Sequence, residues 1–218
     1  MRISKYIHSC ILVENKDERL LIDPGLFSFI EGRVKPEDFR GISTILITHA
    51  HADHYDIKAL KVILKNNSGA KVFANAHMAE ILKNGGLTPE VFEAGERTFG
   101  TFTIKAFFAE HEALPAPLPP NTAFLINETF LHPGDSLSET ILQVPAEIIA
   151  LPVAAPWLTI VGTLGFAGRY KPKQVVPVHD GFIKDFFTER FYPIWETQLK
   201  KQNITFHSLE NPGDFVEV

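Results

Sequence analysis

Short apolar runs separated by polar turns fill most of the chain, and many have the alternating or β-branched pattern of strands. Early strands are expected over 6–13, 19–22, 44–48 and 71–74. Later strands are expected over 91–94, 102–109, 122–126, 129–131, 148–151, 174–178, 204–207 and 215–218. The run 44–48 is apolar and β-branched, which is typical of a central strand buried on both faces.

Helical patterns alternate with these strands over 57–65, 76–83 and 182–202, the last broken or kinked at Pro193. Asp56 is a plausible N-cap for the first of these helices. Two β-rich halves, each followed by helices, predict two facing sheets with helices outside. We therefore expect an α/β fold and a single domain over residues 1–218.

The stretch 148–168 carries no charge and is long enough to span a bilayer. Pro152 and Pro156 interrupt it, and a proline inside a helix removes a hydrogen bond and clashes with the preceding turn. We interpret the stretch as a buried strand, a turn and an apolar helix that begins near Trp157. A membrane span is the alternative.

Composition narrows the function classes. The 218 residues are 45% hydrophobic, enough for one sizeable core, and the net charge is −5. Without a basic cluster this balance argues against binding to nucleic acid. Cys10 is the one cysteine, which excludes an intramolecular disulfide and a cysteine-based zinc site. The first residues lack the apolar stretch of a secretory signal, so a cytoplasmic location is expected.

Four candidate metal ligands directly follow the buried strand 44–48, in the segment Thr48-His49-Ala50-His51-Ala52-Asp53-His54. In extended backbone, side chains two residues apart point the same way, so His49 and His51 can bind one ion. As the chain turns, Asp53 and His54 can address a second ion. Imidazole and carboxylate suit zinc, and also iron or manganese. The small alanines between the polar residues argue against an ordinary solvated loop.

Other candidate ligands also stand at strand ends, where α/β proteins build their sites. Each would be an ordinary turn or surface residue on its own, and their common placement is what indicates a site. These residues are Asp23, His111, Asp135 and His179.

With these residues in place, the chain resembles the metallo-β-lactamase-fold hydrolases over essentially the whole of their minimal domain. His49, His51, Asp53 and His54 match the family's HxHxDH motif, and Asp135 matches its Gly-Asp-Ser/Thr aspartate. Within the superfamily the chain looks most like the small branch that includes ascorbate-6-phosphate lactonase. That branch also places a histidine before a small residue near the N-terminus, as His8-Ser9 does here.

The resemblance implies a four-layer αββα sandwich with two divalent metal ions, most readily Zn²⁺, with Mn²⁺ or iron as alternatives. One ion would be held by His49, His51 and His111, and the other by Asp53, His54 and His179, with Asp135 bridging. Asp23 would orient a ligand through a hydrogen bond, and Asp53 could also move a proton. The implied activity is metal-dependent hydrolysis of a small ester, lactone or phosphodiester by a bridging hydroxide.

Two other classes stay open: an iron-dependent redox enzyme on the same fold, and a non-catalytic metal-binding module. The complete ligand set argues against the second. A small-molecule substrate is expected, with no membrane partner, and a homo-oligomer is possible.

Several further residues have two readings. His8 and His132 could face the site or serve the fold, whereas His77 and His207 are expected to be structural and Cys10 to be a buried inert thiol. Substrate-pocket walls could come from Phe27, Phe29, the loop 114–120 and Trp157. The aromatic cluster of 182–195 is expected to pack against a sheet, with a dimer contact as the alternative.

Overall fold

The computed structural model describes residues 1–218, and strands from both ends of the chain form its first sheet. These strands are β1 (Arg2–Lys5), β2 (Ile11–Asn15), β3 (Glu18–Ile22), β4 (Thr44–Ile47), β5 (Lys71–Ala74), β6 (Glu90–Val91) and β14 (Phe215–Glu217). Their order in the sheet is β14-β1-β2-β3-β4-β5-β6. Neighbours from β14 to β3 pair antiparallel, and neighbours from β3 to β6 pair parallel. The sheet is therefore mixed.

The second sheet repeats this plan with the remaining strands. They are β7 (Gly95–Phe99), β8 (Phe102–Phe108), β9 (Thr122–Ile126), β10 (Phe130–His132), β11 (Ile148–Pro152), β12 (Gln174–Val178) and β13 (Thr205–Phe206), and they lie in the order β13-β12-β11-β10-β9-β8-β7. Pairs from β13 to β10 are parallel and those from β10 to β7 antiparallel.

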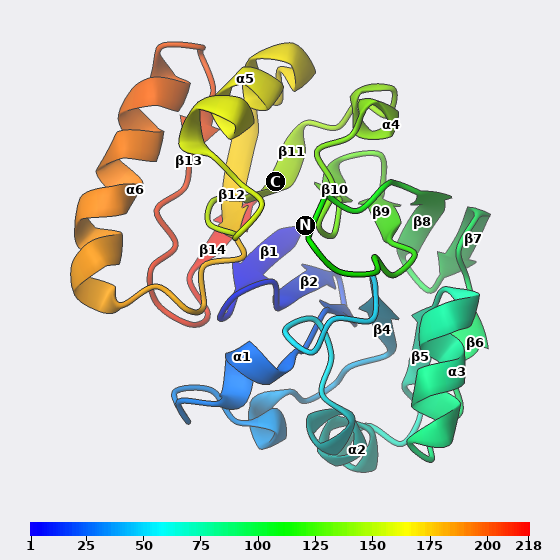
Figure 1. Cartoon of the computed structure of the whole chain (residues 1–218). Coiled ribbons are helices and arrows are strands. Elements are labelled where there is room, and N and C mark those ends of the chain that lie inside the picture. Colours follow the sequence, from blue (N-terminus) through cyan, green and yellow to red (C-terminus); the bar gives the residue numbers. More distant parts are fainter.

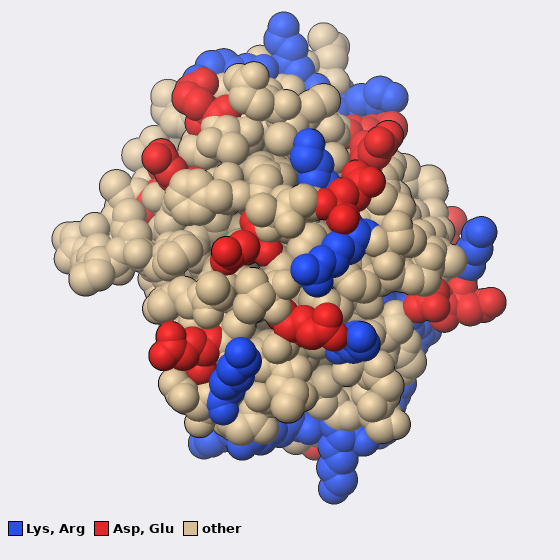
Figure 2. Space-filling view, turned by 90° about the vertical axis from the view of Figure 1, so that its right-hand side faces the viewer, with Lys and Arg blue, Asp and Glu red and all other residues tan.

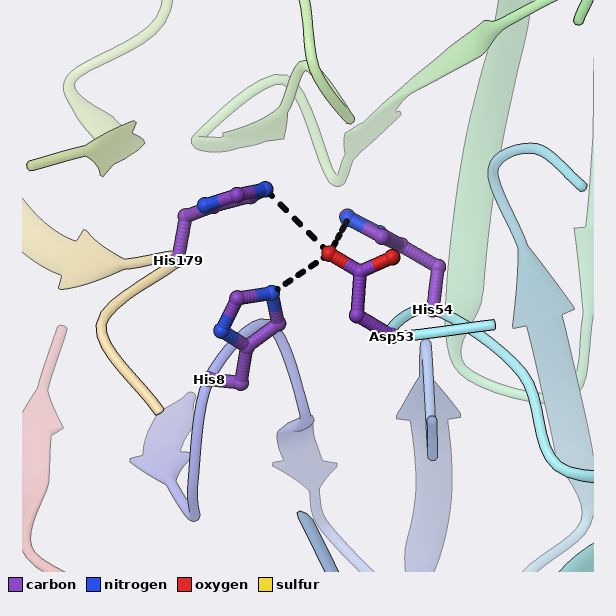
Figure 3. Close-up of side chains that lie close together, drawn as sticks. All are labelled: His8, Asp53, His54 and His179. Atoms are coloured by element: carbon purple, nitrogen blue, oxygen red, sulfur yellow. Dashed lines mark hydrogen bonds and ion pairs between the residues drawn. The ribbon is translucent and has the colours of Figure 1, made fainter. Parts of the chain in front are cut away.

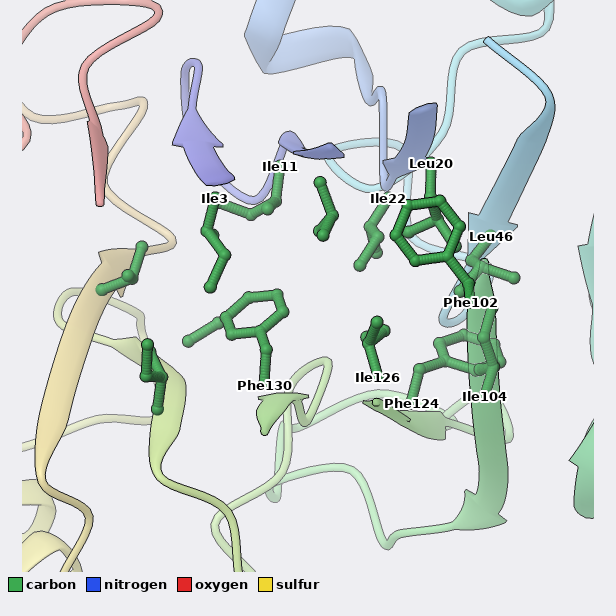
Figure 4. Packing of buried hydrophobic residues seen from close by; sticks show 14 of the residues in the cluster. Ile3, Ile11, Leu20, Ile22, Leu46, Phe102, Ile104, Phe124, Ile126 and Phe130 are labelled. Carbon is green, nitrogen blue, oxygen red and sulfur yellow. The ribbon is translucent and has the colours of Figure 1, made fainter. Parts of the chain in front are cut away.

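The central core lies between the two sheets, where apolar side chains of both inner faces meet (Figure 4). One sheet contributes Ile3, Ile11, Leu20, Ile22 and Leu46, and the other contributes Phe102, Ile104, Phe124, Ile126 and Phe130. All of these side chains are fully buried. Burial of apolar surface on this scale is the main favourable term in folding, and it fixes how the two sheets face each other.

Helices cover the outer faces of both sheets (Figure 1). The main helices are α2 (Ile57–Asn66), α3 (Ala76–Asn84), α5 (Ile160–Tyr170) and α6 (Asp185–Lys200), and the short ones are α1 (Leu26–Phe29), α4 (Glu139–Leu142) and the 3-10 turn η1 (Pro36–Asp38). Helices α2 and α3 pack their buried faces on the first sheet, and α5 and α6 pack on the second. The predicted two facing mixed sheets with helices outside are confirmed as an αββα sandwich.

Local sequence signals explain where the helices begin. The Asp56 side chain accepts hydrogen bonds from the backbone amides of Lys58 and Ala59, as predicted for an N-cap. The apolar helix α5 begins at Ile160 instead of near Trp157, because Thr159 caps it through the amide of Gly162. No helix is long and apolar enough to cross a membrane.

Of two sequence-based expectations about the C-terminal third, the break in the helix at Pro193 is wrong, and the packing of the aromatic cluster holds only in part. Helix α6 continues through Pro193 without a break, because the buried face of Tyr192, Trp195 and Leu199 holds it against the sheet. The aromatic cluster packs only in part. Phe191 and Trp195 are buried, whereas Phe182, Phe186 and Phe187 are about half exposed or more.

The segment around His8 also differs from the expectation of one strand over 6–13. The chain leaves β1 at Lys5, turns through His8, and enters β2 at Ile11. This turn places His8 at the edge where the two sheets meet, and Cys10 behind it in the core. Burial raises the pKa of the Cys10 thiol, which fits the expected inert thiol.

Candidate metal centre

The predicted site residues come together at one edge of the sandwich, beyond the carboxyl ends of several strands. Asp23 follows β3, and the segment from His49 to His54 follows β4, its parallel neighbour. From the second sheet, His111 follows β8, Asp135 follows β10 and His179 follows β12. Strand ends of two facing sheets thus supply every predicted ligand, as expected for sites in α/β folds.

A first group of possible ligands consists of His49, His51, His111 and Asp135. The Nδ1 atom of His51 lies 3.2 Å from Nε2 of His49 and 3.1 Å from Nε2 of His111. Ligand nitrogens around a tetrahedral zinc ion are separated by about 3.3 Å, given Zn–N bonds of about 2.0 Å. The three imidazoles are therefore spaced as a single ion would require.

A second group consists of His8, Asp53, His54 and His179 (Figure 3). Its members converge on the Oδ2 atom of Asp53, which lies 3.0 Å from Nε2 of His8 and 3.4 Å from Nε2 of His179. The Nε2 atom of His54 lies 3.8 Å from the same oxygen. Buried imidazoles around one carboxylate are a second set of metal-ligand atoms.

Asp135 lies between the two groups and contacts both. Its Oδ2 atom lies 3.5 Å from Nε2 of His111 and 3.1 Å from Nε2 of His179. Its Oδ1 atom and Nε2 of His54 are 3.1 Å apart, yet both are buried atoms that form no hydrogen bond. A metal ion bound to this nitrogen and this oxygen would satisfy both, so the residues present fit a pair of ions that share Asp135.

Hydrogen bonds on the far side of the rings fix which nitrogen of each histidine faces the site. Nδ1 of His111 donates to the carbonyl of Glu112 over 2.7 Å, and Nδ1 of His179 donates to the carbonyl of Ala154 over 2.6 Å. Nδ1 of His54 donates to Asp23 over 2.7 Å. With a proton held on Nδ1, Nε2 is the nitrogen that each of these three rings turns toward the site.

Asp23 and Thr48 connect two candidate ligands of the first sheet, His54 and His49, behind the site. Asp23 accepts hydrogen bonds from the amide of Thr48 over 2.8 Å and from its hydroxyl over 2.7 Å. Because that hydroxyl donates to Asp23, it accepts the proton of Nδ1 of His49, 2.9 Å away. The predicted orienting role of Asp23 therefore extends through Thr48 to a second histidine. Sequence reasoning missed Thr48, whose only signal is its position directly before the motif.

Three residues at the site adopt left-handed backbone conformations that non-glycine residues rarely take. The φ angles are 65° at His8, 47° at Asp23 and 67° at His179. Such conformations cost on the order of 1–3 kcal/mol each and persist where the surroundings fix them, often at functional sites. Here the hydrogen bonds of the strand ends provide that fixation.

The electrostatics of the site favour ionised carboxylates. Burial opposes the charged form of Asp135, but the neighbouring His54 and His179 hold its pKa well below the ordinary value. Burial likewise opposes a charge on His54, yet Asp135 and Asp23 hold its pKa well above the usual range. Burial lowers the pKa of His49 strongly. The carboxylates are thus ready to bind a cation, which would displace the proton of His54.

Three histidines, His77, His132 and His207, belong to neither ligand group. His132 is fully buried behind the site, where its Nδ1 accepts from the amide of Gly134 and its Nε2 donates to the carbonyl of Ser9. His207 pairs with Gln174 at the other end of β12 from His179, and His77 is exposed at the start of α3.

Aromatic rings from helix α1 and from two loops border the second group. The Phe27 ring lies 5.1 Å from His8, and the Trp157 ring lies 5.6 Å from His179 and 6.4 Å from His111. Phe182 lies 6.0 Å from both His8 and His179, and sequence reasoning did not foresee it. Phe29, expected as a pocket wall, packs against Phe39 instead.

Two facing mixed sheets with histidine and aspartate ligands at one edge define the metallo-β-lactamase fold. A sequence model of the family described as "Beta-lactamase superfamily domain" matches residues 2–179, and the chain belongs to this family. The family resemblance seen in the sequence is thereby confirmed, while the ascorbate-6-phosphate lactonase branch stays a prediction.

Relatives and solved structures agree with this placement. The chain is 32% identical to protein Rv0786c of Mycobacterium tuberculosis over 84% of this chain and 85% of that protein. It is 28% identical to the UPF0173 metal-dependent hydrolase YtkL of Bacillus subtilis, over 82% and 85%. A crystal structure assigned as a metal-dependent hydrolase of Parabacteroides distasonis has the same fold, with a TM-score of 0.75, 21% identity and coverage of 94% and 90%.

The orienting role of Asp23 gives a first prediction. Asp23→Asn keeps the size of the side chain but removes the charge that accepts from Thr48 and His54, so zinc affinity should fall by roughly 10- to 100-fold. Competition with a chromophoric chelator measures this affinity. The control His207→Ala should bind zinc like the wild type. Loss of zinc in His207→Ala but not in His179→Ala would refute the assignment of the last ligand.

Proposed function

We propose that this protein is a metal-dependent hydrolase that uses two divalent ions on a small ester or lactone. The observation that carries the proposal is the placement of Asp135 between two groups of ligand atoms, with two of the buried polar atoms left without a hydrogen bond. Relatives bearing the name metal-dependent hydrolase support the reaction class.

The chain's own residues divide the work. His49, His51 and His111 would hold one ion, and Asp53, His54 and His179 the other, with Asp135 shared. When bound, the ions would supply an activated water and a Lewis acid for the oxygen that gains charge. We take zinc as the metal because the ligands are imidazole and carboxylate, with Mn²⁺ or iron as alternatives.

Asp53 is suited to move protons as well as to bind a metal. Burial opposes its charge, but the hydrogen bond from His8 and the charge of His54 hold its pKa well below the ordinary value, so it is ionised at neutral pH. Its side chain is 20% exposed, whereas those of His8, His54 and His179 are nearly or fully buried. The low pKa favours the role of ligand, and the exposed edge of the carboxylate supports the exchange of a proton with solvent, the role we assign to it beside that of ligand.

The surroundings of the site favour a neutral, partly apolar substrate over a phosphodiester. Phe27, Trp157 and Phe182 border the ligands, and such apolar walls are typical of small-molecule sites. The ion pairs of lysine and arginine all involve acidic residues outside the two ligand groups. No lysine or arginine therefore forms an ion pair with a residue of the two ligand groups.

The same charge distribution supports the expectation of no nucleic-acid partner. On the face shown in Figure 2, basic and acidic side chains lie beside one another without an extended basic patch. A surface that binds the phosphate backbone of nucleic acid would need a run of lysine and arginine to displace counterions.

We keep a cytoplasmic location as part of the proposal.

The metal content tests the dinuclear part of this proposal. After reconstitution with excess zinc and removal of free metal, the wild type should hold about two ions per chain by elemental analysis. Asp135→Ala should retain less metal and lose turnover of any substrate found, because the shared ligand is gone. A fully reconstituted wild type with one ion would contradict the proposal. Tightly held iron with a visible spectrum would favour the redox alternative.

A substrate panel tests the reaction class. The zinc protein should hydrolyse aliphatic p-nitrophenyl esters and lactones faster than bis(p-nitrophenyl) phosphate. Trp157→Ala and Phe182→Ala should each raise KM for the esters by roughly 3- to 10-fold, about the free energy of one aromatic contact. Phe215→Ala is the matched control, because Phe215 is as exposed as Phe182, at 49%, but lies on β14. Faster cleavage of the phosphodiester would reject the ester assignment.

A further inference from the structure

His8 reaches the second ligand group as closely as any of its members but presents its ring in the opposite way. The other histidines of the site that use Nε2 hold a proton on Nδ1, donated to Thr48, Asp23, Glu112 or Ala154. At His8, Nδ1 instead receives the backbone N–H of Gly181 over 3.0 Å. A backbone amide can only donate, so this nitrogen carries no proton.

This contact determines the protonation of the whole ring. An imidazole whose Nδ1 accepts a hydrogen bond is neutral and carries its single proton on Nε2. That nitrogen lies 3.0 Å from Oδ2 of Asp53, as Figure 3 shows. A protonated Nε2 has no lone pair for a metal, whereas it is well placed to donate to the carboxylate.

We propose that His8 is not a metal ligand but a positioning residue, which donates its Nε2–H to Asp53 and holds that carboxylate toward His54 and His179. The inference rests on the proposed function in one respect, that Asp53 binds the second ion. By distance alone, His8 would count as a fourth ligand of that ion. The proposal gives it a supporting role instead.

The loop after β12, residues 179–184, holds His8 with its proton on Nε2. The amide of His179 donates to the carbonyl of His8 over 3.3 Å, and the amide of Gly181 holds the ring. A Cβ atom on residue 181 would lie 2.8 Å from Cβ of His8, so only glycine allows this approach. The φ angle of 65° at His8 turns its side chain into the contact.

A buried ion pair anchors the start of that loop. The carboxylate of Asp180 accepts from Nζ of Lys5 over 2.6 Å and from the hydroxyl of Tyr192, and Lys5 also donates to the carbonyl of Leu209 over 3.2 Å. Lys5 and Asp180 are less than a tenth exposed, and Tyr192 is fully buried. Since a buried charge is tolerated only when it is paired, this network ties the start of the loop to β1 and α6.

The tautomer of His8 can be read directly by NMR. In long-range ¹H–¹⁵N spectra of the zinc-loaded protein labelled at its 9 histidines, His8 should show a protonated Nε2 and an unprotonated Nδ1. His8→Gln identifies its signals by their loss. A protonated Nδ1 with a zinc-shifted Nε2 at His8 would overturn the proposal. If the wild type bound no second zinc ion, the proposed function would fail, yet the tautomer would still be measured.

Two substitutions at His8 test whether this residue donates a hydrogen bond to Asp53 or binds zinc itself. Glutamine keeps an N–H near the position of Nε2 but is a poor zinc ligand, so His8→Gln should hold the second zinc ion within about 3-fold of wild type. His8→Leu should lower the affinity for the second zinc ion by roughly 10- to 100-fold and leave the affinity for the first ion unchanged. Equal loss of the second ion in both folded variants would show that His8 is a ligand.

Gly181→Ala tests the loop without altering any candidate ligand. The added methyl should push residue 181 away from His8 and remove the N–H contact. The affinity for the second zinc ion should then fall, as is expected for His8→Leu. His207→Gln is the control, because it changes a histidine outside both groups. An unchanged His8 tautomer and unchanged zinc affinity in Gly181→Ala would refute the role of the loop. Circular dichroism confirms that each variant is folded before metal is measured.

Discussion

The buried carboxylate of Asp23 is the interaction on which the site depends. It has no exposed surface, and a charge in that position is tolerated only because the Thr48 amide, the Thr48 hydroxyl and His54 all donate to it. These donors come from the motif segment after β4, and Asp23 directly follows β3, so the parallel pairing of the two strands sets their positions. Through Thr48 the same carboxylate also fixes the ring of His49.

A single pattern of proton positions follows from this constraint. Backbone carbonyls, Thr48 and Asp23 accept the Nδ1 protons of four candidate ligands, so their Nε2 atoms point toward the site from both sheets. These four are His49, His54, His111 and His179. His51 faces its group with Nδ1 instead, and at His8 and His132 a backbone amide donates to Nδ1. For His8, such a hydrogen bond is what separates the proposed supporting role from that of the neighbouring candidate ligands.

Much of the fold and the ligand set could be predicted from the sequence, because both depend on local patterns. The apolar run before His49 predicts a buried strand, and the spacing of His49, His51, Asp53 and His54 predicts metal ligands at its end. Asp23, His111, Asp135 and His179 could be placed through their common position at strand ends, supported by the family resemblance. All of them meet in the structure.

What the sequence could not provide depends on three-dimensional contacts. The orientation of His8 requires the approach of Gly181, far along the chain, and nothing local to His8 indicates it. Phe182 approaches the site only because the loop after β12 is anchored by Asp180. Helix α6 tolerates Pro193 because tertiary packing of Trp195 and Leu199 outweighs one lost hydrogen bond, a balance that propensity alone does not reveal.

The central claim is that both ligand groups bind metal and share Asp135. A crystal structure of the zinc-loaded protein, with anomalous difference maps calculated on both sides of the zinc edge, tests it most directly. We expect two peaks per chain, one among His49, His51 and His111 and one among Asp53, His54 and His179, with Asp135 in contact with both. A single peak in fully loaded crystals, or a second peak bound to neither Asp53 nor His179, would contradict this account.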